Sequence, residues 1–305
     1  MEGDHFSPDT VTTDSWGRKR FEVKKAYDRG SKTSVKLSFA EIVPTEGVKP
    51  ESGINKRYDM SQHPHGIAVI INNKKFRPPP SSSDPVVKLS KRAASDTDEQ
   101  NLSKTFRYLG YNVEIYREPE ALLEVFKKIV STRSAELATH DSFVCCILSH
   151  GEDGKVFGSD SKLVDLTDIT SELKTCKSLH GKPKMFFIQA CRGKEGKNMT
   201  DRGVVEPRAR VATDSDSKIP TEADFFISFA TPSGYVAWHP TDKEDKNGSP
   251  YIKALCQTFC TSAKHAKLGD MHTVVNDEVS KYETDTGYKQ APELTDRLRK
   301  EVYFL

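Results

Sequence analysis

His150 and Cys191 are the residues of this sequence whose types and positions best fit chemistry, because each comes just after an apolar run. A cysteine thiol with an ordinary pKa of about 8.5 is mostly protonated at neutral pH, so a nucleophilic cysteine benefits from a histidine base. Gly151 and Gly193 would let backbone N–H groups approach a substrate carbonyl and stabilise an oxyanion. The pattern indicates nucleophilic catalysis by a Cys-His pair. On placement alone, a structural role for both residues stays open.

The elements that must position this pair predict an α/β fold. Continuous apolar runs at 66–72, 142–149 and 184–189 are typical of strands buried on both faces. Strands that alternate with helices favour a parallel sheet covered on both faces, and ligands bind such sheets at the carboxyl ends of the strands. The other expected elements are strands at 113–116, 223–230 and 300–305, and helices at 95–109 (capped by Ser95-Asp96), 120–130, 171–177, 249–261 and 271–283.

Composition excludes several classes of protein. A formal net charge of +2 argues against a nucleic-acid coat, and no window approaches the roughly 18 apolar residues of a membrane span. The acidic first residues are followed by no apolar run, so we expect no secretory signal. Six cysteines without a CxxC pair, two of them adjacent at Cys145 and Cys146, favour reduced, buried thiols and a cytoplasmic location. Cys256, Cys260 and His265 lack a fourth ligand, so core packing is favoured over a metal site.

Two polar stretches divide the chain. Residues 1–57 show no sustained period and are interpreted as a mostly disordered leader. The basic run within it, 18–36, fits either a solvated tail, which we favour, or a docking patch for acidic partners. Residues 192–222 are rich in Gly, Lys, Arg and Asp, which predicts a functional loop or a processing linker.

Six motifs in order carry a resemblance to a known family. They are Gln189-Ala190-Cys191-Arg192-Gly193, Ser149-His150-Gly151-Glu152, the strand end at 71–76, the segment from Arg92 to Asp96 with Asp98 and Asn101-Leu102, the segment 219–225, and Glu301-Val302-Tyr303-Phe304. From about residue 58 to 305 the chain resembles the caspases, and its short leader resembles that of executioner members.

The resemblance implies a fold and a site. It implies an open, mostly parallel six-stranded sheet, a large subunit at 58–214, a small subunit at 215–305, and a homodimer of both. Cys191 would attack the peptide carbonyl, His150 would act as acid and base, and the N–H groups of Gly151 and Cys191 would hold the oxyanion. The remaining implied site residues bind substrate, with no cofactor or metal: Arg92 and Gln189 for the Asp carboxylate, Ser149 beside them, and Trp238 in the neighbouring pocket.

One pocket position departs from the family pattern. His239 stands where the family has a second pocket arginine, and no arginine occurs between Arg210 and Arg297. Losing one charge-assisted hydrogen bond costs about 1.5–3 kcal/mol. His239 could replace the arginine when protonated, which a gain of activity at slightly acidic pH would reveal. Alternatively Lys243 or Lys246 could swing in, or the pocket could bind Asp poorly.

Aspartates in polar loops suggest processing. Asp214, followed by Ser215, is the favoured cleavage site, with Asp216 and Asp201 weaker and Asp14 a counterpart in the leader. The expected function is a cysteine endopeptidase that cleaves proteins after exposed Asp residues, made as a zymogen and acting in apoptosis-type proteolysis. Upstream initiator caspases are candidate activators, and neither nucleic acid nor a membrane is an expected partner. The alternative is a weakly active or inactive homologue that regulates active caspases by dimerisation.

Overall fold

The structure is a computed structural model that describes residues 11–13, 19–21, 56–77, 89–119, 121–193, 222–237, 248–284, 287 and 289–305. The chain divides into two compact units, Met1–Lys36 and Leu37–Leu305. In the first unit, β1 (Val11–Thr13) and β2 (Lys19–Phe21) form an antiparallel pair in which Val11 lies opposite Phe21. The sequence did not predict this pair. The remaining residues of the predicted leader up to 55 lie outside the described residues.

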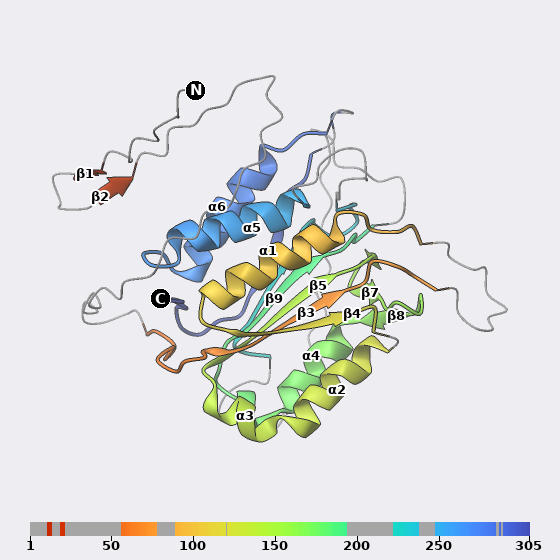
Figure 1. Cartoon of the computed structure of the whole chain (residues 1–305), viewed down its shortest axis with the longest axis horizontal. Coiled ribbons are helices and arrows are strands. Elements are labelled where there is room, and N and C mark those ends of the chain that lie inside the picture. Colours follow the sequence, from red (N-terminus) through yellow and green to blue (C-terminus); the bar gives the residue numbers. More distant parts are fainter. Residues whose placement is uncertain are drawn as a thin grey trace, which may run out of the picture. The chain divides into compact units, whose positions relative to one another are not determined.

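The second unit is built on a six-stranded sheet with the order β11-β10-β9-β5-β3-β4 (Figure 1). Five strands are parallel, and the edge strand β11 pairs antiparallel with β10. The predicted fold class is therefore confirmed. Every residue of β3, β5 and β9 is buried, which explains why these strands are continuous apolar runs. The strands are β3 (Gly66–Asn72), β4 (Asn112–Arg117), β5 (Ser142–Leu148), β9 (Lys184–Gln189), β10 (Phe225–Phe229) and β11 (Glu293–Asp296).

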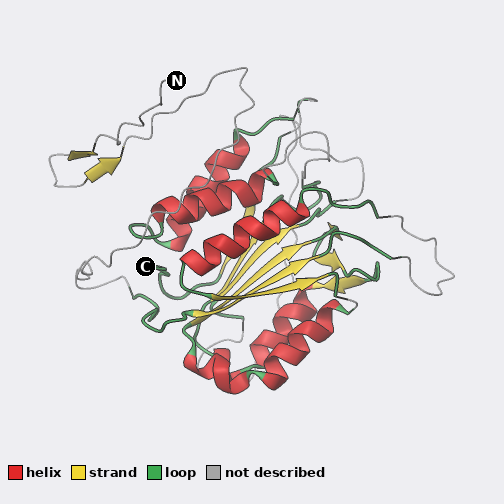
Figure 2. Ribbon diagram, in the orientation of Figure 1, coloured by secondary structure: helices red, strands yellow, loops and turns green. Residues whose placement is uncertain are grey.

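Helices cover both faces of this sheet (Figure 2). One face packs against α1 (Ser95–Tyr108), α5 (Pro250–Ser262) and α6 (Leu268–Ser280). The other packs against α2 (Leu122–Thr132), α3 (Ser134–Thr139) and α4 (Leu166–Thr175), which the short helix η1 (Lys177–Leu179) follows.

Alternate residues of each strand supply the two cores. Cys145 and Cys146 consequently face opposite cores. Both are fully buried free thiols, and burial raises the pKa of each, so the prediction of buried strand cysteines is confirmed.

Three expectations about local structure were wrong. Residues 300–305 form no strand, because Val302 and Phe304 alternate like strand residues but are buried in the core beside α5 and α6. Ser95 does not cap α1. The helix begins at Ser95 with Ala94 as its N-cap, and the Ser95 hydroxyl donates to Asn72 instead. The helix expected at 171–177 begins five residues earlier, at Leu166.

A small second sheet was also missed. It consists of β6 (Gly151–Glu152), β7 (Lys155–Phe157) and β8 (Leu163–Asp165), paired antiparallel. Within the described part of the chain, no helix is long and apolar enough to cross a membrane. In the same residues, no group of three or more His, Cys, Asp or Glu side chains could hold a metal ion.

A buried histidine makes the stability of the second unit dependent on pH. His272 Nε2 lies 2.8 Å from Ser228 Oγ, and burial lowers the pKa of His272 from 6.5 to about 4. The unfolded chain therefore takes up a proton near pH 6.5 that the folded protein takes up only near pH 4. Stability is full above pH 6.5 and is lost as the pH falls toward 4, by about 2 kcal/mol at pH 5.

We therefore expect His272→Gln, which cannot titrate, to flatten this dependence. Urea unfolding at pH 7 and pH 5 measures it, with exposed His180→Gln as the matched control. An equal loss of stability between the two pH values in the wild type and His272→Gln would contradict the prediction.

Candidate active site

The sheet brings His150 and Cys191 to the same side, at the carboxyl ends of its parallel strands. β5 and β9 are parallel neighbours in register, with Leu148 opposite Gln189, and each of the two residues follows two positions after its strand end. Ser149 N–H also donates to the Gln189 carbonyl at 3.1 Å. The predicted placement of each residue just after a buried strand is therefore confirmed, and the structure shows that the two strands are neighbours.

Gly151 packs the histidine loop directly against the cysteine loop. A Cβ atom added to Gly151 would lie 2.6 Å from the Lys155 carbonyl oxygen and 2.9 Å from that of Cys191. Backbone atoms cannot move aside cheaply, so a side chain at this position would push the two loops apart. The glycine therefore keeps the backbone after His150 close to Cys191.

The imidazole of His150 is oriented by the segment before α1. Its Nε2 lies 2.8 Å from the Ser90 carbonyl oxygen, and its ring stacks at a tilt on Phe76 with centroids 4.9 Å apart. Because a carbonyl oxygen accepts but cannot donate, Nε2 carries the proton in this contact. Nδ1 of the neutral ring is then the nitrogen with the lone pair, which is what a base requires.

Cys191 is half-buried at the border of the core under α1, α5 and α6. Its Sγ donates to the Ala237 carbonyl oxygen at 3.7 Å. Ala237 is the last described residue before the segment 238–247. The thiol therefore contacts the backbone just before the segment 238–247, which contains the predicted pocket residues Trp238 and His239.

Arg92 and Gln189, the predicted carboxylate ligands, are both buried near Cys191. Arg92 Nη1 donates to Ser95 Oγ at 3.1 Å, while Arg92 Nε has no hydrogen-bond partner among the residues that the structure describes. Burial lowers the pKa of Arg92, and the charges of Asp98 and a Cys191 thiolate oppose this shift. A buried guanidinium with an unused donor is an arrangement that a ligand carboxylate completes.

The other predicted site residues have different surroundings. Ser149 is buried, and its hydroxyl donates to the Phe157 carbonyl oxygen at 2.6 Å, so it joins β5 to the small sheet. A role for Ser149 in binding substrate stays a prediction. The rest lie outside the described residues: Trp238 and His239 in the pocket, and the processing sites Asp214, Asp216, Asp201 and Asp14.

Arg192 was not singled out from the sequence, although it lies next to Cys191 in the motif. Its guanidinium pairs with Asp153 after the histidine loop at 3.1 Å and with Glu293 on β11 at 2.9 Å, and it lies 4.1 Å above the Phe229 ring. Its backbone bonds Gly234 and Tyr235, the latter by Arg192 N–H donating to the Tyr235 carbonyl at 2.9 Å. The Arg192 side chain therefore joins the loops of both predicted catalytic residues to the edge strand β11.

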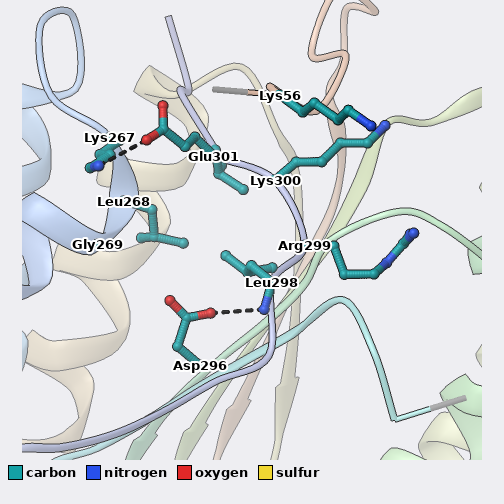
Figure 3. A pocket seen from close by; sticks show the side chains of 10 residues that line it. Lys56, Lys267, Leu268, Gly269, Asp296, Leu298, Arg299, Lys300 and Glu301 are labelled. Atoms are coloured by element: carbon teal, nitrogen blue, oxygen red, sulfur yellow. Dashed lines mark hydrogen bonds and ion pairs between the residues drawn. The ribbon is translucent and has the colours of Figure 1, made fainter. Parts of the chain in front are cut away.

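A cavity of about 380 Å³ lies beside β11, toward the amino ends of the parallel strands (Figure 3). Asp296, one of its lining residues, pairs with Phe226 near the amino end of β10, far along the strands from Cys191. Two contacts join lining residues to each other: Lys267 donates to Glu301 at 2.8 Å, and Asp296 accepts from the Leu298 N–H. This cavity contains neither His150 nor Cys191 and is not the candidate active site.

Comparison with known proteins agrees with the fold. Residues 65–303 match the family model of the caspase domain, a family of cysteine-type peptidases. The chain belongs to the caspase family.

Among similar curated proteins, caspase-3 of Bos taurus is 34% identical over 89% of this chain and 96% of its own length. Caspase-7 of Gallus gallus is 30% identical over the full length of both chains. Caspase-8 of Mus musculus is 35% identical over 88% of this chain, which covers 57% of that protein.

Proposed function

We propose that this protein is a cysteine endopeptidase that cleaves peptide bonds after Asp. The observation that carries the proposal is the buried Arg92 guanidinium, with an unused Nε donor, next to a Cys-His pair at one sheet edge. A carboxylate is the natural partner for that fork, whereas a basic substrate side chain would be repelled.

The proposed reaction uses the groups already described. His150 Nδ1 takes the thiol proton, and the Cys191 sulfur attacks the carbonyl carbon of the substrate Asp. Backbone N–H groups of Gly151 and Cys191 stabilise the tetrahedral oxyanion. His150 then gives its proton to the leaving amine, and a water molecule, deprotonated by the same imidazole, releases the acyl group from sulfur.

Matched tetrapeptide reporters that end in Asp, Glu or Asn test the proposal. The processed protein should cleave the Asp reporter selectively, and Cys191→Ala should lose this activity. Selective cleavage would show that Arg92 and Gln189 suffice with His239 in place of an arginine. If dimeric, processed protein cleaves no reporter, the protease proposal fails.

His239 favours a second candidate function. With one pocket arginine missing from the sequence, the protein could bind Asp too weakly for efficient turnover and act by pairing with active caspases. Such a regulator would form mixed dimers with an active caspase and change that enzyme's activity. An efficient Asp-directed enzyme would cleave reporters as a homodimer by itself.

The zymogen proposal rests on the polar stretch at 192–222. We expect cleavage after Asp214 to yield fragments 1–214 and 215–305, because exposed polar loops are where nicking concentrates. Asp214→Ala should remain a single chain when the wild-type chain is cut, as measured by mass spectrometry. Asp216→Ala is the matched control and should be processed like the wild type. A wild-type cleavage pattern in Asp214→Ala would refute this site.

The proposed dimer follows from the sheet edge. The sheet has edges at β4 and β11, and we propose that a second copy covers β11. An unpaired edge strand is an aggregation hazard unless another chain covers it. We further propose apoptosis-type protein substrates with exposed Asp residues, activation by upstream initiator caspases, and a cytoplasmic location.

Arg192→Met is expected to reduce kcat/KM for the Asp reporter by about tenfold. The variant loses two partly exposed ion pairs and one cation–π contact, together worth about 1–2 kcal/mol. Steady-state kinetics measure the effect. Lys267→Met is the control, because it breaks an ion pair, to Glu301, that lies in the cavity away from the candidate active site. Equal activities in the two variants would show that the Arg192 contacts do not support the site.

A further inference from the structure

Asp98, in the first turn of α1, is a buried carboxylate that the proposed mechanism does not use. It has no exposed surface, and it accepts two hydrogen bonds of 2.6 Å, from the Ser249 N–H and the Ser249 hydroxyl. Arg92 immediately precedes the same helix. Asp98 therefore connects the element that carries the pocket arginine to the start of α5.

The backbone before Ser249 is built closely around this carboxylate. Gly248 has φ of +91°, and a Cβ atom added there would lie 2.5 Å from Asp98 Oδ1. A side chain at this position would be both strained and in collision with the carboxylate. The chain at 248–249 is therefore shaped to bring its backbone against Asp98.

Gly248 and Ser249 are also where the segment 238–247, which contains Trp238 and His239, rejoins the described chain. At its other end, Ala237 accepts the Cys191 thiol hydrogen bond. Ala237 and Ser249, which flank this segment, thus contact Cys191 and Asp98 respectively.

The charges that face Asp98 come from two elements. Arg92 lies before α1 and favours the ionised carboxylate. Among the described residues, Asp98 also interacts with the buried Cys256 thiol on α5. Burial raises the pKa of Asp98 from 3.8 to about 6, against the opposing effect of the Ser249 hydrogen bonds. The carboxylate is therefore ionised at neutral pH and takes up a proton under mildly acidic conditions.

We propose that Asp98 is a positioning residue that holds the start of α5 against the first turn of α1, directly after the Arg92 segment, and thereby sets the affinity of the Arg92 pocket for the substrate. This inference rests on the proposed function and names a determinant of its specificity pocket. We expect Asp98 to act on substrate binding, because its charge interacts with that of the pocket residue Arg92.

Asp98→Asn and Ser249→Ala test the contact from its two sides. Each should raise KM for the Asp reporter about tenfold with kcat within about twofold, since one charge-assisted contact is lost. The double variant should be no worse than Asp98→Asn alone, because Ser249→Ala removes only the hydroxyl hydrogen bond, one of the two that Asp98→Asn already weakens. Asp96→Asn is the matched control, an exposed carboxylate two residues earlier that pairs with Lys74. A change in kcat alone, or a KM equal to that of Asp96→Asn, would overturn the proposal.

The pH profile separates positioning from general destabilisation. In the wild type KM should rise as the pH falls through about 6, while in Asp98→Asn it should stay at its raised value across this range. Parallel profiles for the two proteins would contradict the proposal. Thermal unfolding of both variants checks that they are folded.

Binding to Cys191→Ala protein distinguishes failure of this inference from failure of the proposed protease. Calorimetry would give Kd for the Asp-ending peptide without turnover, with and without Asp98→Asn. A Kd weakened about tenfold by Asp98→Asn supports the inference even if the wild type proves catalytically inactive. An unchanged Kd, or no peptide binding at all, overturns it.

Discussion

Arg92→Gln is expected to lower kcat/KM for peptides with Asp before the cleaved bond by about 10² to 10⁴. A bidentate guanidinium–carboxylate contact contains two charged hydrogen bonds worth about 1.5–3 kcal/mol each, and glutamine cannot supply either of them. Arg92 is fully buried, so little water can take over its role. Steady-state kinetics with Asp, Glu and Asn reporters measure both the loss and the expected fall in selectivity.

Arg92→Lys is the informative companion variant. It keeps the positive charge next to Asp98 but not the planar fork, so it should lie between the wild type and Arg92→Gln. Because the guanidinium also offsets the buried Asp98 charge, thermal unfolding must show both variants folded at the assay temperature. Wild-type selectivity for Asp in folded Arg92→Gln would remove Arg92 from the proposed pocket.

Asp224→Ala is expected to have the largest effect on stability, a loss of about 3–4 kcal/mol in the free energy of unfolding. Asp224 is buried and binds Arg299 through two hydrogen bonds of 2.8 and 2.9 Å, and it also accepts from the Tyr58 hydroxyl at 2.5 Å. Its φ of 67° adds strain for alanine that asparagine tolerates better. Urea denaturation at neutral pH measures the change.

Two variants separate the contributions at this site. Asp224→Asn keeps the shape and the tolerance of positive φ but loses the charge, so it should cost about half as much. Glu222→Ala breaks two surface ion pairs, with Lys174 and Arg297, and should cost less than about 1 kcal/mol. A loss in Asp224→Ala no larger than that in Glu222→Ala would mean that the Asp224 contacts contribute little.

The strands that form the centre of the sheet could be predicted from sequence because they are buried on both faces. The runs at 66–72 and 184–189 coincide with β3 and β9 at both ends. The edge strand β11 was missed because Glu293–Asp296 is a short, largely polar segment of partly exposed residues. Residues 300–305 misled the prediction because burial every second residue is also produced by packing against helices.

The site was partly predictable for the same reason. Strand ends fix where His150 and Cys191 lie, so two reliable strands placed both residues. Contacts across the chain carry no such local signal: Arg192 meets Glu293 from a strand that was not expected, and Asp98 meets Ser249 151 residues away. Gly248 offered a faint indication, because a glycine before a helix invites a search for what its backbone approaches.

The position of β10 determines how the two fragments would be associated after a cut in the polar stretch 192–222. β10 lies between β9, which precedes residue 194, and β11, which follows residue 222. The severed halves therefore share one core, and each alone would expose an apolar strand edge. In the uncut chain the two halves meet within one molecule. After cleavage two separate molecules must associate, so the rate of refolding from separated halves is second order in protein concentration. The stability of the nicked protein then rises with its concentration, whereas that of one uncut copy has no such dependence.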